Sequence, residues 1–106
     1  MRVIFSSVQL VVVTVALLCG WQASAADADH GAELAKRWCA ACHLVASDQQ
    51  QANVQAPTFA TIAAKSDFTA EKVAFFLLDP HPKMPNFPLS RTEAADLAAY
   101  IGSLRK

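Results

Sequence analysis

Five consecutive residues of this 106-residue chain combine two thiols with an imidazole, in the order Cys39-Ala40-Ala41-Cys42-His43. The Cys-x-x-Cys-His spacing is the attachment signature of a c-type haem. On a helical turn, positions i and i+3 lie on the same side, so both thiols can add to the two vinyl groups of one porphyrin. The motif therefore predicts one covalently bound haem c, tethered by Cys39 and Cys42, with His43 as an axial ligand of its iron.

Two other chemistries use similar residues. A thioredoxin-like redox motif follows a β-strand within a βαβ pattern, and no such pattern is visible. A zinc site needs three or four ligands. His30 or His81 could add one ligand to the motif, but the sequence contains no second cluster of Cys and His. Both alternatives are weaker than haem attachment.

The iron has a second axial position, for which Met84 is the natural ligand. A thioether favours ferrous iron, and His/Met ligation raises the reduction potential. Met84 is the only methionine after Met1, and it lies in a proline-bounded loop. The alternatives are that Met84 fills the core, or that His81 binds the iron. We expect His81 at the surface between prolines, and His30 solvated ahead of the first helix.

Pro57 is the expected partner of the haem-ligating histidine. Such a histidine usually donates its other ring nitrogen to a nearby acceptor. A proline carbonyl suits this role because the residue has no N–H of its own and its ring fixes the loop. The alternative is that Pro57 is an ordinary loop proline.

The N-terminus has the features of a secretory signal peptide. A basic start, Met1-Arg2, precedes an apolar run from Val8 to Cys19 and a small-residue cleavage site at Ala23-Ser24-Ala25. The run is about a dozen residues, short of the ~20 that a membrane-spanning helix needs. We therefore expect residues 1–25 to be a cleaved signal peptide and residues 26–106 to form one periplasmic domain. Cleavage after residue 26 fits equally well, and an uncleaved anchor is the alternative.

Charge and cysteine content narrow the function further. The chain has nine basic and nine acidic residues, so removal of Arg2 leaves eight against nine, a net charge of minus one. Nucleic-acid binding normally requires a basic surplus, so we expect no nucleic-acid partner. Both cysteines beyond residue 25 lie in the motif, which leaves no disulfide framework. A covalently held haem would supply the apolar core that so small a domain lacks.

The pattern of apolar residues predicts an all-α domain of about four helices. The first helix is expected from about Asp29 to Cys42, capped by Asp27 or Asp29. Its apolar positions recur at helical spacing, namely Leu34, Ala35, Trp38 and Ala41. Gly31 lowers helix propensity, and we expect it to let another backbone come close. A polar, exposed loop is expected over residues 47–53.

Two further helices are expected in the middle of the chain. Residues 58–65 predict a short helix that buries Phe59 and Ile62. Thr69 can cap the next helix, which carries an apolar stripe of Val73, Phe76 and Leu77. Phe75 and Leu78 widen this stripe, so we expect the helix to be buried on more than one side.

The last helix follows a proline-rich segment. Four prolines over residues 80–88 require extended or turned backbone. Ser90-Arg91-Thr92-Glu93 then forms a capping box. Apolar residues follow at helical spacing, namely Leu97, Tyr100, Ile101 and Leu104.

With these motifs the chain resembles the small class I cytochromes c, exported electron carriers of bacteria, over about residues 29–105. The resemblance implies a cytochrome c fold, with an N-terminal helix that enters the haem motif and a C-terminal helix that crosses it. The family features correspond to Cys39, Cys42, His43, Pro57, Met84-Pro85 and Tyr100, and Gly31 resembles the family glycine at the helix crossing.

The chain departs from the family pattern at two positions. Leu44 follows the motif where the family often has glycine, and Ala35 stands where many members have an aromatic residue. Neither change affects the expected chemistry, although both leave the assignment to a subfamily open.

The resemblance implies a soluble monohaem protein, not an enzyme, that carries single electrons between periplasmic redox partners. An electron donor and an acceptor would dock transiently, with no membrane span after signal cleavage. Apolar side chains are expected to exclude water from the haem, namely Trp38, Phe59, Ile62, Phe76 and Leu97. Four lysines could lie at the rim of the site, although each taken singly is better interpreted as an ordinary solvated lysine: Lys36, Lys65, Lys72 and Lys83.

Two other functions remain open from the sequence. One is a haem sensor or peroxidase-like protein with an open or displaceable sixth ligand. The other is a haem subunit of a larger dehydrogenase or oxidase complex.

Overall fold

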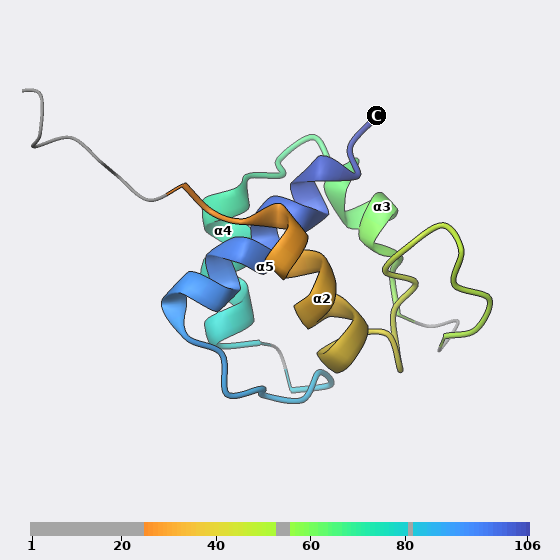
Figure 1. Ribbon diagram of the computed structural model, residues 1–106, viewed down its shortest axis with the longest axis horizontal. Coiled ribbons are helices and arrows are strands. Elements are labelled where there is room, and N and C mark those ends of the chain that lie inside the picture. Colours follow the sequence, from red (N-terminus) through yellow and green to blue (C-terminus); the bar gives the residue numbers. More distant parts are fainter. Residues whose placement is uncertain (1–24, 53–55, 81) are drawn as a thin grey trace, which may run out of the picture.

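The computed structural model describes residues 25–52, 56–80 and 82–106, and these form four α-helices (Figure 1). The helices are α2 (Ala28–Trp38), α3 (Phe59–Ala63), α4 (Ala70–Leu78) and α5 (Arg91–Ser103). The described residues contain no strand, and the predicted all-α class is confirmed. The predicted signal peptide falls almost wholly on residues 1–24, and His81 also lies outside the described part. None of the helices in that part is long and apolar enough to span a bilayer.

Helix α5 is the centre of the fold, because α2, α3 and α4 all pack against it. Figure 1 shows α2 lying across α5. At this crossing a Cβ atom on Gly31 would overlap the backbone oxygen of Asp96 and lie 2.9 Å from Cβ of Tyr100. Only a residue without a side chain permits so close an approach. Gly31 therefore has the role that the sequence predicts.

Each helix begins at a capping side chain. Asp27 caps α2, Thr58 caps α3 and Thr69 caps α4. Ser90 and Glu93 form the predicted capping box of α5, with two hydrogen bonds of 3.0 Å. Such caps are typically worth about 1 kcal/mol each. The short helices of this domain depend on them, since helices of this length are marginal on their own.

A single hydrophobic core joins the four helices. Its buried side chains come from every element, namely Leu34, Ala35, Phe59, Ala63, Leu77, Ala94, Leu97 and Ile101. Residues 79–90 carry no helix or strand among those described, in agreement with their proline content. This segment packs on the end of α2, where the ring centroids of Trp38 and Phe87 lie 5.4 Å apart.

Two predictions about the helices are wrong. Helix α2 ends at Trp38 rather than at Cys42, because Cys39 is its C-cap and residues 40–43 continue as a turn. Ala41 is consequently exposed. Helix α4 does not bury Phe75 and Leu78, the residues that we expected to widen its buried stripe. It packs against α5 alone among the helices, so Phe75 stays 78% exposed and Leu78 37% exposed.

Candidate haem-binding site

An apolar cavity of about 460 Å³ lies beside α5 and contains four of the predicted site residues in its wall: Cys39, His43, Pro57 and Met84. Helices α3, α4 and α5 contribute most of the apolar wall, namely Phe59, Ile62, Val73, Phe76, Leu77 and Ile101. A volume of this size and an apolar wall with few polar groups are typical of cofactor pockets.

His43 is held in one orientation by Pro57. Its Nδ1 lies 2.6 Å from the carbonyl oxygen of Pro57, so Nδ1 must carry the proton that is donated. This tautomer leaves the lone pair of Nε2 for a metal. The Phe59 ring packs beside the imidazole with ring centroids 5.4 Å apart. The backbone N–H of Phe59 donates to the Leu44 carbonyl at 3.0 Å, which closes the loop between them.

The two cysteines of the motif lie in different surroundings. Cys39 is buried and lines the cavity, whereas Cys42 is exposed outside it, and neither is in a disulfide. Burial, together with the nearby Cys42, raises the pKa of the Cys39 thiol from 9.0 to about 11. The backbone N–H groups of Cys42 and His43 both donate to the Cys39 carbonyl, at 3.2 and 2.9 Å. One turn therefore carries both thiols and the imidazole.

Met84 is half-buried and packs against the core while it lines the cavity. The proline loop thus brings a thioether into the same cavity as the His43 imidazole. The rival ligand His81 lies outside the described residues. His30 does not line the cavity, and it is not ahead of the first helix as predicted. It lies in the first turn of α2, with Nδ1 2.8 Å from Oδ2 of Asp96.

The expectation about water-excluding side chains is correct only in part. Phe59, Ile62 and Phe76 line the cavity. Trp38 does not, because it packs against Phe87 instead. Leu97 is fully buried in the helical core, away from the cavity wall.

The lysines also divide into two groups. Lys65 and Lys72 line the cavity, whereas Lys36 and Lys83 do not. The first two come from the connection between α3 and α4 and from the first turn of α4.

Gln49 is a structural residue that the sequence analysis missed. We expected an exposed polar loop, but the Gln49 side chain is half-buried. Its Oε1 accepts from the Val45 N–H at 2.9 Å. Its Nε2 lies 2.8 Å from the carbonyl oxygens of Ala40 and His43 and 2.9 Å from that of Gln51, so its two hydrogens are shared among three acceptors. The side chain ties the loop to the haem motif. A glutamine within a polar run gives no sequence signal for this role.

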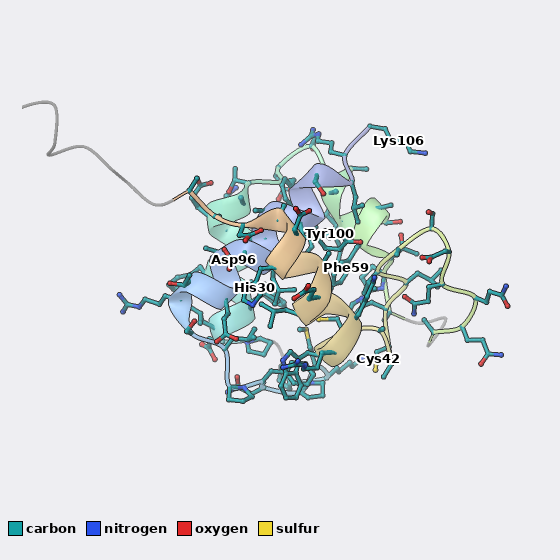
Figure 2. All side chains as sticks on the ribbon, viewed as in Figure 1. His30, Cys42, Phe59, Asp96, Tyr100 and Lys106 are labelled. Carbon is teal, nitrogen blue, oxygen red and sulfur yellow. The ribbon has the colours of Figure 1, made fainter. Side chains whose placement is uncertain are left out.

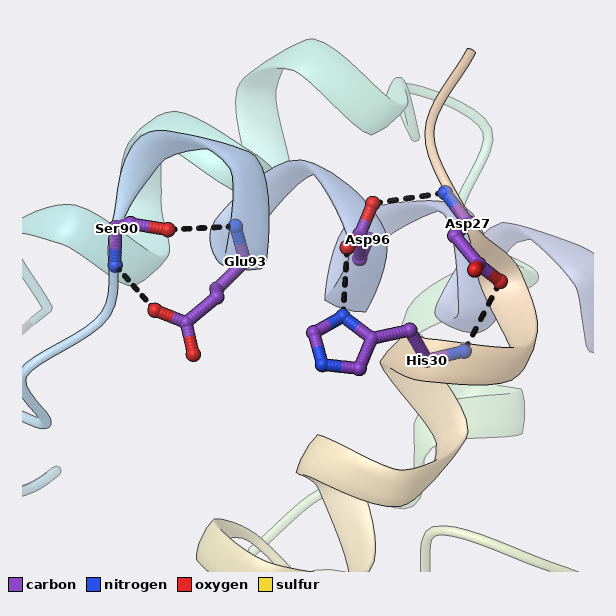
Figure 3. A network of polar contacts seen from close by, with 5 residues as sticks. All are labelled: Asp27, His30, Ser90, Glu93 and Asp96. Carbon is purple, nitrogen blue, oxygen red and sulfur yellow. Dashed lines mark hydrogen bonds and ion pairs between the residues drawn. The ribbon is translucent and has the colours of Figure 1, made fainter. Parts of the chain in front are cut away.

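A second missed feature is the polar cluster at the start of α2 (Figure 3). The buried Asp96 carboxylate accepts from the Asp27 N–H at 2.7 Å and pairs with His30. The hydrogen bond from His30 and that from Asp27 lower the pKa of Asp96. Asp96 in turn raises the pKa of His30. Asp96 lies one turn before Tyr100, on the face of α5 toward α2. This spacing is the sequence signal that could have predicted the contact of Asp96 with the start of α2.

The side chains of the cavity fit a c-type haem better than the alternatives. Across residues 25–52, 56–80 and 82–106, no three His, Cys, Asp or Glu side chains are placed to hold a metal ion, as a zinc site would require. A thioredoxin-like motif would follow a strand, which the described part does not contain. The cavity instead offers an imidazole, a thioether and a thiol between apolar walls, a donor set suited to covalently attached haem iron.

Comparisons with known proteins agree with this geometry. The family described as "Cytochrome C oxidase, cbb3-type, subunit III" matches residues 26–101. The chain is 70% identical over 83 residues to "Cytochrome c-552" of Bradyrhizobium diazoefficiens, which covers 78% of this chain and 80% of that protein. No solved structure matches the chain significantly. The chain belongs to the c-type cytochromes, electron-transport proteins that hold one covalently bound haem c and its iron.

Proposed function

We propose that this cytochrome carries single electrons between periplasmic redox partners, with its haem iron ligated by His43 and Met84. The observation that carries this proposal is an apolar cavity whose wall contains His43, Met84 and Cys39 together. The bound haem supplies an iron that gains and loses one electron reversibly. With His43 and Met84 both bound to the iron, oxygen and peroxide would find no open site.

The residues of the chain have separate tasks in this proposal. The Pro57 carbonyl holds Nδ1–H of His43 and so directs Nε2 toward the iron. Met84 would hold the iron through its thioether, which brings no charge into the cavity. Phe59, Ile62 and their apolar neighbours exclude water, which keeps the surroundings of the iron similar in both oxidation states.

Replacement of Met84 by Ala tests the ligand assignment. We expect the ferric protein to show a weak near-infrared methionine–iron charge-transfer band that the variant lacks. The reduced variant should bind carbon monoxide rapidly, and its reduction potential should fall. Asn86→Ala, at an exposed position of the same loop, is the matched control and should behave as the parent protein. If the parent protein lacks the band and binds carbon monoxide rapidly, the sensor or peroxidase-like function is favoured instead.

Export is part of the proposal. We propose that residues 1–25 are removed as a signal peptide and that the domain works in the periplasm. Mass spectrometry of the protein from periplasmic extracts should give a chain that begins at residue 26 or 27. A chain that retains Met1 and stays with the membrane fraction would contradict this.

One finding favours a second function, that of a haem subunit in a larger complex. The description of the matching family names a subunit of a cbb3-type oxidase. The domain could be a dedicated haem subunit of such a complex. Native size-exclusion chromatography of periplasmic and detergent-solubilised membrane extracts separates the two functions. A free carrier elutes as a small protein from the periplasm, whereas a subunit elutes with a large complex.

A further inference from the structure

The polar side chains of the cavity wall, apart from the motif histidine, come from one short segment. Lys65, Asp67, Thr69 and Lys72 all line the cavity, and all belong to the connection from α3 to α4 and the first turn of α4. The other lining residues are apolar or are the proposed tether and ligands. The cavity therefore has one polar edge, which carries two ammonium groups and one carboxylate.

The covalent tether fixes which edge of the haem faces this segment. The two vinyl groups of the porphyrin lie on neighbouring pyrrole rings, and the two propionates lie on the other two rings. Attachment at Cys39 and Cys42 therefore directs the propionates to the opposite edge. In Figures 1 and 2 the connection from α3 to α4 crosses one end of the molecule, whereas Cys42 lies toward the other end. We propose that Lys65 and Lys72 bind the two haem propionates.

Electrostatics supports this pairing. A carboxylate at the mouth of an apolar cavity loses part of its hydration and needs a compensating charge or hydrogen bond. Lys72 is already held at the polar edge of the cavity, with Nζ 3.4 Å from the backbone oxygen of Asp67. Thr69 accepts from the Lys72 N–H, and its hydroxyl hydrogen stays available as a donor. The Asp67 carboxylate repels the propionates, but the two lysines outnumber it, so the net charge of this edge is positive.

The proposal rests on haem attachment alone and not on the assignment of Met84. Besides the propionates, the charged or titratable groups on the cavity wall are His43, Lys65, Asp67 and Lys72, together with Cys39, which becomes a thioether in the haem-loaded protein. Removal of a lysine charge and removal of the Asp67 charge should shift the propionate pKa values in opposite directions, which allows a sharp test.

The test uses the intact haem protein and the variants Lys65→Gln, Lys72→Gln and Asp67→Asn. The pKa values of the propionates are read from the pH dependence of their proton resonances, and the reduction potential is measured in parallel. Each lysine variant should raise the pKa of one propionate by about one unit and lower the potential. Asp67→Asn should shift both quantities in the opposite direction. Lys65→Arg should retain the parent values.

Lys36→Gln is the matched control, since it removes the same charge from α2, away from the cavity wall. The proposal is overturned if Lys65→Gln and Lys72→Gln shift the propionate pKa values no more than this control does. The near-infrared band should persist in every variant. Absence of that band from the parent protein would contradict Met84 ligation, while the propionate shifts would still test the lysines.

Discussion

The crossing of α2 and α5 and the proposed haem cavity differ in their contacts: the crossing is packed by the chain itself, whereas the cavity wall stays partly exposed. At the crossing the backbone of α5 meets Gly31 directly, and Asp96 satisfies the Asp27 N–H and the His30 ring. At the cavity, Phe76 lines the wall and is 40% exposed, and under the proposed function the haem would cover it. We therefore expect substitutions at the crossing to change the stability of the fold, and substitutions at the cavity to change the redox chemistry of the proposed haem site. Substitutions in the two regions should therefore change different quantities, the unfolding free energy at the crossing and the reduction potential at the cavity.

The largest expected effect is at Gly31. A Cβ atom in Gly31→Ala would overlap backbone atoms of Asp96, which cannot move without displacing α5. We expect a loss of about 3 kcal/mol or more in the free energy of unfolding, with little change in the reduction potential of the protein that folds. Chemical denaturation of the haem-loaded protein gives the first quantity and voltammetry the second.

The matched control is the second described glycine in a helix. In Gly102→Ala the new Cβ would meet only the Phe68 ring, at 3.3 and 3.4 Å. Alanine is also the better helix former by about 1 kcal/mol, so the net change should be small. An equal loss of stability in the two variants would contradict the close crossing at Gly31.

Gln49 tests whether the loop after the motif depends on one side chain. Gln49→Ala leaves partly buried backbone groups of Ala40, His43 and Val45 without their partner. We expect a loss of about 1–3 kcal/mol in unfolding free energy, measured by the same denaturation. Gln50→Ala, at the adjacent exposed position, should leave stability unchanged. The proposed role of Gln49 is wrong if the two variants are equally stable.

The smallest effect is the pH dependence of the pair between His30 and Asp96. The pKa of His30 is raised above 6.5, so its contribution is fully present below pH 6.5 and is lost as the pH rises through the raised value. The pKa of Asp96 is lowered below 3.8, so its contribution is present above pH 3.8 and is lost as the pH falls through the lowered value. The pair therefore stabilises the fold most between pH 3.8 and 6.5.

Denaturation of the parent protein and of His30→Ala, measured within this range and on to alkaline pH, gives the effect. The difference in unfolding free energy should be greatest near the acidic side of neutrality and should shrink toward alkaline pH. A difference that stays constant from pH 5 to pH 9 would show that the ion pair adds nothing. The reduction potential should change little, because His30 lies outside the cavity wall.

The sequence predicted local features well because they depend on neighbouring residues. The capping box at Ser90 and the helical spacing of α5 follow from rules that act within a few residues. The Cys-x-x-Cys-His motif is equally local. Gly31 was predicted because a glycine in an amphipathic helix needs a packing reason.

The wrong predictions mostly concern side-chain contacts between residues that lie far apart in the sequence. Nothing near Trp38 shows that it turns toward Phe87 rather than toward the cavity. The contacts of His30 and Gln49 depend on Asp96 and on the path of the loop, which the periodicity of the sequence does not contain. Exposure of Phe75 on α4 follows from α4 having only α5 as a helical neighbour.

Proton NMR of the reduced protein tests the central claim most directly, because ferrous iron with two strong axial ligands is diamagnetic. Met84 is the only methionine after Met1, so a ligated methionine should give a single three-proton methyl resonance. The porphyrin ring current should shift that resonance far upfield, and it should vanish in Met84→Ala. A methyl resonance of Met84 at its ordinary position in the reduced protein would contradict His43 and Met84 as the two ligands of the iron.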